Sequence, residues 1–232
     1  MNPITIVFLV ILLFNSMGRI ASDPLNWLMG IVMMLPGIVI GLSFHEFAHG
    51  YVSHKLGDPT PKSQGRLTIN PLAHIDPIGL LCLMFVGFGW GIPVQINPRY
   101  YKHPRRAELI VALAGVVTNL IIAIVAMGIF KLCVSLAPSM LYTGMGAGIL
   151  TMINYIISIN LVLMVFNLLP IPPLDGFNVI TQIFNLRNTE LYYKVYDKGM
   201  WILLVLILFN FTSLILSPSI NFLYSLIYNL FF

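Results

Sequence analysis

Long apolar segments separated by short polar loops dominate this sequence. They cover about residues 4–17, 27–51, 109–133, 147–169, 200–216 and 219–232. A helix rises about 1.5 Å per residue, so about 20 apolar residues cross the ~30 Å hydrocarbon core of a bilayer. Only 9% of the residues are charged, against about 25% in an average soluble domain. We therefore expect an all-α polytopic membrane protein with about six transmembrane helices, and we exclude a soluble enzyme or a nucleic-acid binder.

The apolar stretch at 78–90 is too short to cross a bilayer as a helix, which needs about 20 residues. It is also rich in glycine, with Gly79, Gly87 and Gly89. The following segment, 91–98, has the pattern of a short extended strand that ends in a turn. We therefore predict a re-entrant or hairpin element with a short β element between the second and third transmembrane helices.

Basic residues are distributed unevenly between the two sides of the expected bundle. If 78–90 does not cross, ten of the twelve Lys and Arg residues fall on one face, and only Arg19 and Lys131 fall on the other. Cytoplasmic loops carry an excess of Lys and Arg. We therefore expect a multi-pass protein of the cell membrane with both termini and the 53–106 region in the cytoplasm. If 78–90 crossed, the split would weaken to eight against four.

The chain shows no tandem repeat, low-complexity tract or soluble domain. We therefore expect one integral-membrane domain over 1–232, with its core at about 27–186. The sequence makes no prediction of the oligomeric state.

The second apolar segment contains His45-Glu46-Phe47-Ala48-His49 toward its expected cytoplasmic end. Histidines at i and i+4 lie on one face of a helix, one turn apart, as two ligands of one metal ion require. Glu46 lies beside them as a candidate general base for a metal-bound water. Ionisable groups inside a membrane are costly and mark functional sites. The motif therefore predicts a hydrolytic metal site at membrane depth.

A catalytic zinc needs three protein ligands and one open position. The candidates for the third ligand are His54, Asp58, His74, Asp76 and Asp175. His54 follows His49 by five residues and so points away from the His45/His49 face. Asp175 stands out, because it follows a proline-rich break at 170–173 that the charge-derived topology puts at the same face and a similar depth. Irregular backbone at membrane depth is tolerated where it lines a cavity.

Three motifs together resemble those of the site-2 protease family of intramembrane zinc metalloproteases. They are His45-Glu46-x-x-His49, Asn70-Pro71-x-x-His74-x-Asp76-Pro77-x-Gly79, and Asn167-x-x-Pro170-x-x-Pro173-Leu174-Asp175-Gly176. The match runs from about Gly41 to Gly176, and the length is similar to that of compact members without PDZ or CBS domains. The family usually carries Ala-Gly-Pro followed by Asn three residues on. This chain has Ala114-Gly115-Val116 and then Asn119, so only the proline is missing; we expect this difference to change the helix locally and to leave the zinc site intact.

The resemblance implies roles for individual residues. It implies Asp175 as the third zinc ligand, with one Zn²⁺ per chain, and Asn167 as a residue that binds the substrate strand or steadies the oxyanion. It also implies regulated intramembrane proteolysis of single-span membrane proteins within the lipid bilayer. The implied substrates in bacteria are anti-sigma factors, membrane-tethered transcription factors and remnant signal peptides.

His74 and Asp76 allow two interpretations. They could orient a zinc ligand from behind, or they could fasten their own loop through hydrogen bonds to its backbone. The remaining acids, Asp23, Asp58, Glu108, Glu190 and Asp197, are expected to be solvated or interfacial. The Arg105-Arg106 pair is expected to anchor phospholipid rather than to read a substrate.

Two other classes of protein remain as alternatives. A metal-ion or proton transporter would also embed His and Asp in the membrane, although transporters often show paired broken helices, and this sequence predicts one break at 170–173. A binding protein without catalysis is the third class, which the presence of both the base and the ligands disfavours.

Overall fold

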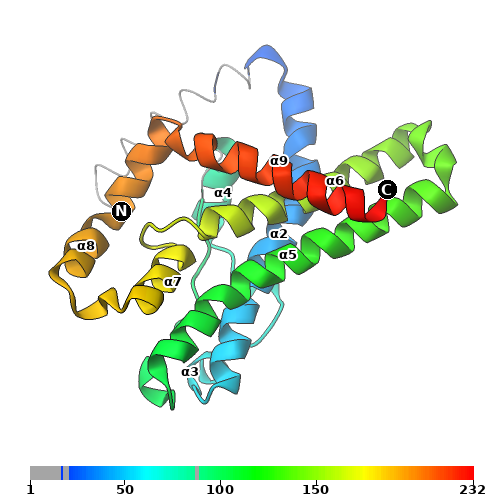
Figure 1. Cartoon of the computed structure of the whole chain (residues 1–232). Helices are drawn as coiled ribbons and strands as arrows, with labels where there is room; N and C mark the ends of the chain where they lie inside the picture. The colour runs from blue at the N-terminus through cyan, green and yellow to red at the C-terminus, as the bar shows by residue number, and fades with distance from the viewer. Residues whose placement is uncertain (1–16, 18–20, 87–88) are drawn as a thin grey trace.

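The computed structural model describes residue 17 and residues 21–86 and 89–232 (Figure 1). The described residues form helices joined by turns and loops, and they include no β strand. The α helices are α2 (Pro24–Lys55), α3 (Thr60–Ser63), α4 (Pro77–Val86), α5 (Pro104–Leu136), α6 (Gly144–Asn167), α7 (Asp175–Phe184), α8 (Glu190–Leu208) and α9 (Phe211–Phe231). Single 3₁₀ turns lie at Pro71–Ala73, Pro98–Tyr100, Pro138–Leu141 and Leu186–Asn188.

Four of the described helices, α2, α5, α6 and α9, are long and apolar enough to cross a membrane. This finding confirms the expected class, an all-α protein with several helices of membrane length. The predicted first span at 4–17 falls outside the described residues, apart from Met17. The bounds predicted for the last two spans, 200–216 and 219–232, are wrong. The chain turns at Asn210, whose φ of 59° is left-handed and ends helical geometry, so that 200–208 belong to α8 and 211–231 to α9.

The two faces of α5 differ in a way that suits a lipid environment. Its exposed face carries large apolar side chains at helical spacing, namely Ile110, Val117, Ile121, Val125, Ile129 and Leu132. Its buried face carries small residues and one amide, with Ala112, Gly115, Asn119, Ala123 and Ala126. A water-exposed helix would show the opposite arrangement. The outer face of α5 therefore suits contact with hydrocarbon, and its inner face suits close packing against α2 and α6.

Small residues allow α2 to lie close to α6. A Cβ at Gly37 would lie 3.1 Å from the Ile156 Cα, and a Cβ at Gly41 would lie 2.6 Å from the Leu163 Cδ1. Close backbone approach at glycines spaced four apart is a common way for membrane helices to associate. Helix α9 packs against α6 and α5 at the other end of the bundle, around Met127, Ile157 and Leu161 (Figure 1).

Helix α4 and the later residues 89–92 lie side by side, as the two arms of the predicted hairpin would. Helix α4 has only ten residues. A Cβ at Gly79 would lie 2.0 Å from the Trp90 carbonyl oxygen, and Ile75 pairs with Gly91 in an isolated antiparallel bridge. The two ends of the element therefore meet on one side. The predicted short β element is wrong, because two backbone N–H groups of 91–98, those of Val94 and Asn97, donate to the carboxylates of Glu46 and Asp58 instead of a strand.

The predicted break after the fourth span is present. Helix α6 ends at Asn167 and α7 begins at Asp175, with irregular backbone between them. The chain folds back closely here, since a Cβ at Gly176 would lie 2.2 Å from the Leu168 carbonyl oxygen. Only glycine fits after Asp175 without a shift of this backbone, so the Asp-Gly pair is the local reason that the carboxylate stands at the start of α7.

Candidate metal centre

The structure brings His45, His49 and Asp175 together in the interior. The Nε2 atoms of the two imidazoles are 3.0 Å apart. The Oδ2 atom of Asp175 lies 3.1 Å from the His45 Nε2 and 3.3 Å from the His49 Nε2. Three ligand atoms at about 2.0–2.1 Å from a tetrahedral zinc lie about 3.3–3.4 Å from one another. The observed triangle has nearly this size, so the three side chains form a candidate metal cluster.

The outer nitrogens of both histidines are occupied by oxygen atoms. His45 Nδ1 lies 2.6 Å from the Oδ1 of Asn119, and His49 Nδ1 lies 2.7 Å from the backbone carbonyl oxygen of Val111. A carbonyl oxygen only accepts, so Nδ1 of His49 must carry a proton, and the same holds for His45 with the amide oxygen facing it. In the neutral imidazole this leaves the lone pair on Nε2. Both lone pairs then point into the cluster.

The inner side of the cluster requires a positive charge. Two Nε2 lone pairs and the Oδ2 atom of Asp175 face one another, and this buried oxygen accepts no hydrogen bond within the described residues. Such a group of electron-rich atoms is repulsive unless a cation lies among them. Two imidazoles and one carboxylate form a donor set that zinc uses in catalytic sites. The residues present therefore fit a zinc ion.

Gly115 of α5 makes room for both imidazoles. A Cβ at this position would lie 2.6 Å from the His45 Cε1 and 2.6 Å from the His49 Nε2. The rings therefore pack directly against the backbone of α5, which also supplies the Val111 carbonyl. No general pattern of hydrophobicity in the sequence would show that this glycine belongs to the metal centre.

A buried amide chain continues behind His45. Asn119 donates through Nδ2 to the Gly41 carbonyl and to the Oδ1 of Asn160, which in turn donates to the Ile156 carbonyl. Both asparagines are fully buried. Neither asparagine was assigned a role from the sequence. One signal was their polarity within long apolar segments, since polar groups inside a membrane bundle generally have a partner or a function; for Asn119, the motif that resembles the family's was a second signal.

Glu46 stands beside the metal cluster and faces the segment 92–97. Its Oε2 accepts a hydrogen bond of 2.8 Å from the backbone N–H of Val94. His45, Glu46, His49 and Asp175 all line one cavity of about 420 Å³. Asn167 lines the same cavity from the end of α6, where its Nδ2 donates to the Leu163 carbonyl. The catalytic and substrate-binding candidates thus share one space.

Four other candidates from the sequence lie apart from the metal cluster. The hydrogen bonds of His74 and Asp76 remain within their own loop, to the Thr68 carbonyl and the Gly79 N–H. His54 contacts the Asp58 carbonyl. The Asp58 carboxylate accepts hydrogen bonds from Ser53, Thr60 and Asn97. This arrangement matches the loop-fastening interpretation of His74 and Asp76.

Two of the acids that we expected to be solvated or interfacial are enclosed by protein. Asp58 is fully buried. Glu108 is 12% exposed, lies at the cavity wall, and pairs with Arg187 and Gln182. Arg105, which we expected to anchor phospholipid, donates to the carbonyls of Gln182 and Ile183 at the end of α7. The side chains of Asp58, Glu108 and Arg105 thus form hydrogen bonds between elements that are distant in the sequence. Such long-range contacts are not visible in a sequence pattern.

Helices of membrane length that bury two histidines and a carboxylate, with a glutamate beside them, define a membrane metallohydrolase. Comparison with known proteins agrees with this class. Residues 134–210 match the model of peptidase family M50; this stretch contains Asp175 but not the HExxH motif. "Putative zinc metalloprotease YwhC" of Bacillus subtilis is 37% identical over 206 residues, which cover 88% of this chain and 92% of the relative.

A second group of relatives carries the name "Putative zinc metalloprotease Rip2". The protein from Mycolicibacterium smegmatis is 27% identical over 87% of this chain and 79% of its own length. The protein from Mycobacterium tuberculosis is 27% identical over 86% of this chain and 72% of its own length. No solved structure matches the chain significantly. The chain belongs to peptidase family M50, the site-2 protease family of zinc metalloproteases, and this confirms the resemblance of its motifs.

Proposed function

We propose that the protein is an intramembrane zinc metalloprotease that hydrolyses peptide bonds within or beside transmembrane segments of single-span membrane proteins. One observation carries the proposal: the three ligand atoms and Glu46 meet in one cavity, and both histidines come from a helix that is long and apolar enough to cross a membrane. Membership of a zinc metalloprotease family supports hydrolysis over the transporter alternative.

The proposed site holds one Zn²⁺ per chain between His45, His49 and Asp175. When bound there, zinc supplies Lewis acidity, which polarises the scissile carbonyl and lowers the pKa of water from about 15.7 toward about 7. The protein keeps both imidazoles in the tautomer that presents Nε2 to the metal, through Asn119 and the Val111 carbonyl. Partners of this kind generally raise metal affinity.

Glu46 is the proposed general base. Its carboxylate takes the proton of the attacking water and later delivers it to the leaving amine nitrogen. The hydrogen bond from Val94 holds one carboxylate oxygen at the cavity wall, which leaves the other oxygen to exchange the proton. A fixed carboxylate needs less reorganisation during the reaction than a freely rotating one.

The substrate is proposed to lie in an extended form between the 92–97 segment and helix α8. Pro93, Val94 and Ile96 line one wall of the cavity, and Tyr192 and Tyr196 line another. A helical substrate hides its carbonyls and must unwind before attack, and backbone pairing with 92–97 would hold the unwound segment. Asn167 uses one amide N–H on the Leu163 carbonyl, so its second N–H is available to the oxyanion.

The proposed setting is a cell membrane with both termini in the cytoplasm and the site toward the cytoplasmic side. It rests on the ten-to-two distribution of Lys and Arg. We also propose six spans and one domain with its core at about 27–186. The proposed role is regulated intramembrane proteolysis of the substrate classes that the resemblance implies. The proposal includes no nucleic-acid partner.

The test compares three variants of the purified full chain in lipid vesicles. We expect Glu46→Gln to keep its zinc and to lose cleavage of single-span substrates, because only the base is removed. Asp175→Asn should lose both zinc and cleavage, and Asp197→Asn, an exposed acid, is the control that should keep both. Zinc is measured by mass spectrometry.

A second experiment searches for the substrates by proteomics of membrane fractions. It compares cells that carry the wild-type protein with cells that carry Glu46→Gln, and substrates are the single-span proteins that remain uncut in the variant. Full cleavage by Glu46→Gln would contradict the mechanism.

A further inference from the structure

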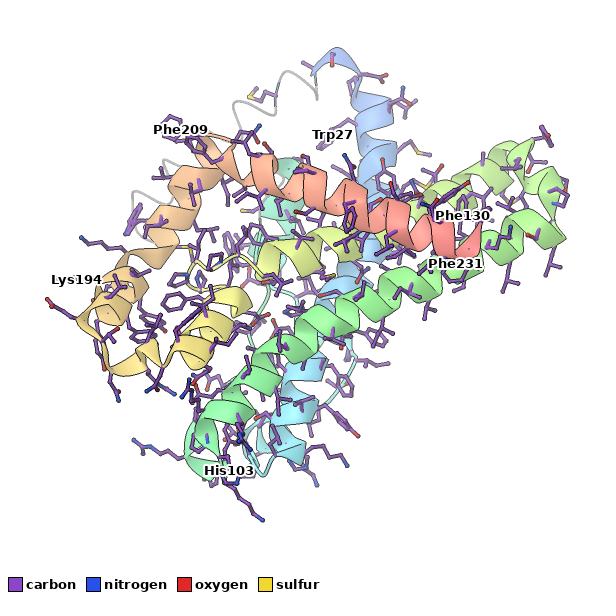
Figure 2. The ribbon with its side chains drawn as sticks, viewed as in Figure 1. Trp27, His103, Phe130, Lys194, Phe209 and Phe231 are labelled. Atoms are coloured by element: carbon purple, nitrogen blue, oxygen red, sulfur yellow. The ribbon has the colours of Figure 1, made fainter. Side chains whose placement is uncertain are left out.

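A basic pocket lies where α2 ends and α5 begins, and it shares no lining residue with the cavity at the metal centre. It has a volume of about 460 Å³, and four of its lining residues are basic: Lys55, Lys102, His103 and Arg106. Figure 2 labels His103 at this end of α5, where basic side chains extend outward. None of the described residues that line the pocket is acidic. Lys55, Lys102 and Arg106 form no salt bridge within the part of the chain that the structure describes.

The carboxylate of Asp58 does not line this pocket. Asp58 lies behind Tyr101, fully buried, and its oxygens accept hydrogen bonds from Ser53, Thr60 and Asn97. The first turn of α5 adds to the positive character, since it contains no acidic residue and His103 makes no side-chain cap. Its free N–H groups therefore suit an anion beside the cationic side chains.

An apolar groove continues from this pocket along the same two helices. It has a volume of about 480 Å³ and is lined by residues such as Phe44, Phe47 and Tyr51 of α2 and Leu113 and Val117 of α5. Ile110 lines both cavities. Lys55 joins them as well, because its Nζ lies 5.4 Å from the centre of the Tyr51 ring.

The two cavities together have the length and polarity of one lipid molecule. From Arg106 to Thr118, α5 rises about 18 Å, close to the roughly 15 Å depth of one leaflet's hydrocarbon. The basic end lies at the terminus of two candidate membrane-spanning helices, where headgroups lie. Basic pockets between transmembrane helices commonly bind anionic headgroups.

We propose that this cleft between α2 and α5 binds one anionic phospholipid, with its phosphate in the basic pocket and an acyl chain in the apolar groove. The pocket selects for negative charge through Lys55, Lys102 and Arg106, and the groove requires a hydrocarbon chain. A free phosphate or a soluble anion would fill only half of the cleft. The inference does not depend on proteolysis, because no residue of the cleft lines the cavity that contains Glu46.

The experiment uses the full chain, exchanged into nanodiscs of phosphatidylglycerol and phosphatidylethanolamine in equal amounts. Native mass spectrometry then counts the lipids that stay bound to the protein after it is released from the nanodisc. We expect one retained phosphatidylglycerol per chain, in preference to phosphatidylethanolamine. The triple variant Lys55→Gln, Lys102→Gln and Arg106→Gln should weaken this retention by roughly 100-fold, given the loss of three cations near the phosphate. A matched triple, Lys62→Gln, Lys194→Gln and Lys198→Gln, removes the same charge elsewhere and should retain the lipid.

A second pair of variants tests the acyl chain. Val117→Trp fills the groove and should displace the lipid, whereas Val125→Trp, on an equally exposed part of the same helix, should not. Excess glycerol phosphate should fail to displace the lipid from the wild-type protein. Equal retention of both lipids, retention unchanged in the basic triple variant, or displacement by glycerol phosphate alone would overturn the proposal. So would normal lipid retention with impaired substrate cleavage in Val117→Trp, which would assign the groove to a substrate helix.

Discussion

His45 Nδ1 and Asn119 Oδ1 lie 2.6 Å apart in the interior of the bundle. This contact joins α2 to α5 and fixes which nitrogen of His45 faces Asp175. Asn119 is itself held by the Gly41 carbonyl and Asn160. The orientation of His45, the first proposed zinc ligand, therefore depends on a buried amide chain that spans three helices.

Replacing Asn119 by leucine should weaken zinc binding. The change leaves His45 Nδ1 without its acceptor, and loss of such a partner typically lowers metal affinity by roughly 10–100-fold. Titration of the purified protein against a competing chelator measures the affinity. Asn160→Leu is the matched control, since it removes an equally buried amide that does not touch the imidazole and should cost less zinc affinity. Wild-type affinity in Asn119→Leu would contradict a positioning role.

Gly115→Ala should disrupt the candidate metal centre by pushing the His45 and His49 rings away from α5. Its new methyl group would lie 2.6 Å from atoms of both imidazoles, so the rings must move. Because zinc ligands tolerate only small displacements, we expect zinc affinity to fall by at least roughly tenfold. Gly148→Ala, where the nearest atom is the Met33 Cε at 3.6 Å, should bind zinc normally. Zinc content after dialysis compares the two variants, and equal content would show that the rings can adjust.

The Val94 N–H should matter for turnover more than for zinc. Val94→Pro removes the donor to Glu46, so we expect kcat to fall by roughly 10–100-fold through misplacement of the base, with zinc content unchanged. Val94→Ala keeps the N–H and should remain active. Proline at Ile96 tests substrate pairing separately, because in the described structure the backbone donor to Glu46 is Val94 and not Ile96. Full activity in Ile96→Pro would count against backbone pairing at that residue.

Asp58 should stabilise the fold only above acidic pH. Burial alone would raise its pKa, but hydrogen bonds from Thr60, Asn97 and Ser53 outweigh burial and lower that pKa below its usual value. A lowered folded-state pKa gives stability that is complete above the unfolded-state pKa of about 3.9 and is lost as the pH falls through the folded-state value. We expect Asp58→Asn to cost about 2–3 kcal/mol at pH 7.

Thermal unfolding between pH 7 and pH 3 checks this expectation. The difference in Tm between the wild type and Asp58→Asn should be constant down to about pH 5 and should narrow below about pH 4. Asp197→Asn, which changes an exposed acid, should match the wild type throughout. A difference in Tm that persists unchanged at pH 3 would show that the charge of Asp58 is not its source.

Much of the metal centre was predictable because its local part follows helix geometry. The spacing of His45 and His49 places both rings on one face of any regular helix, whatever surrounds it. The apolar context of Glu46 and the proline-rich break before Asp175 are also visible in the sequence. In contrast, three contributions to the site could not be predicted in this way: the space left by Gly115, the Val111 carbonyl and the Val94 N–H. Every residue type has a backbone carbonyl, and all but proline have a backbone N–H, so the residue type does not show which of these groups contacts the site.

The predictions that the structure contradicts also have a common physical origin. The 91–98 segment has the pattern of a strand, yet carboxylates rather than a neighbouring strand take the Val94 and Asn97 N–H groups. In the sequence, Asp58 and Glu108 resemble surface acids, but in the structure they are enclosed and accept hydrogen bonds from residues distant in the chain. The end of α8 depends on the backbone conformation of Asn210 within an otherwise apolar run.

The sequence by itself determined the environment and the local geometry of this protein. Its long apolar segments require helices in lipid, and the HExxH spacing requires two ligands on one face. Only the tertiary structure decided that Asp175 completes the cluster within 3.3 Å of both imidazoles, that Asn119 orients one of them, and that α2 and α5 enclose a basic and apolar cleft. The reason is that hydrophobic periodicity acts within one helix, whereas ligand convergence depends on how separate helices pack.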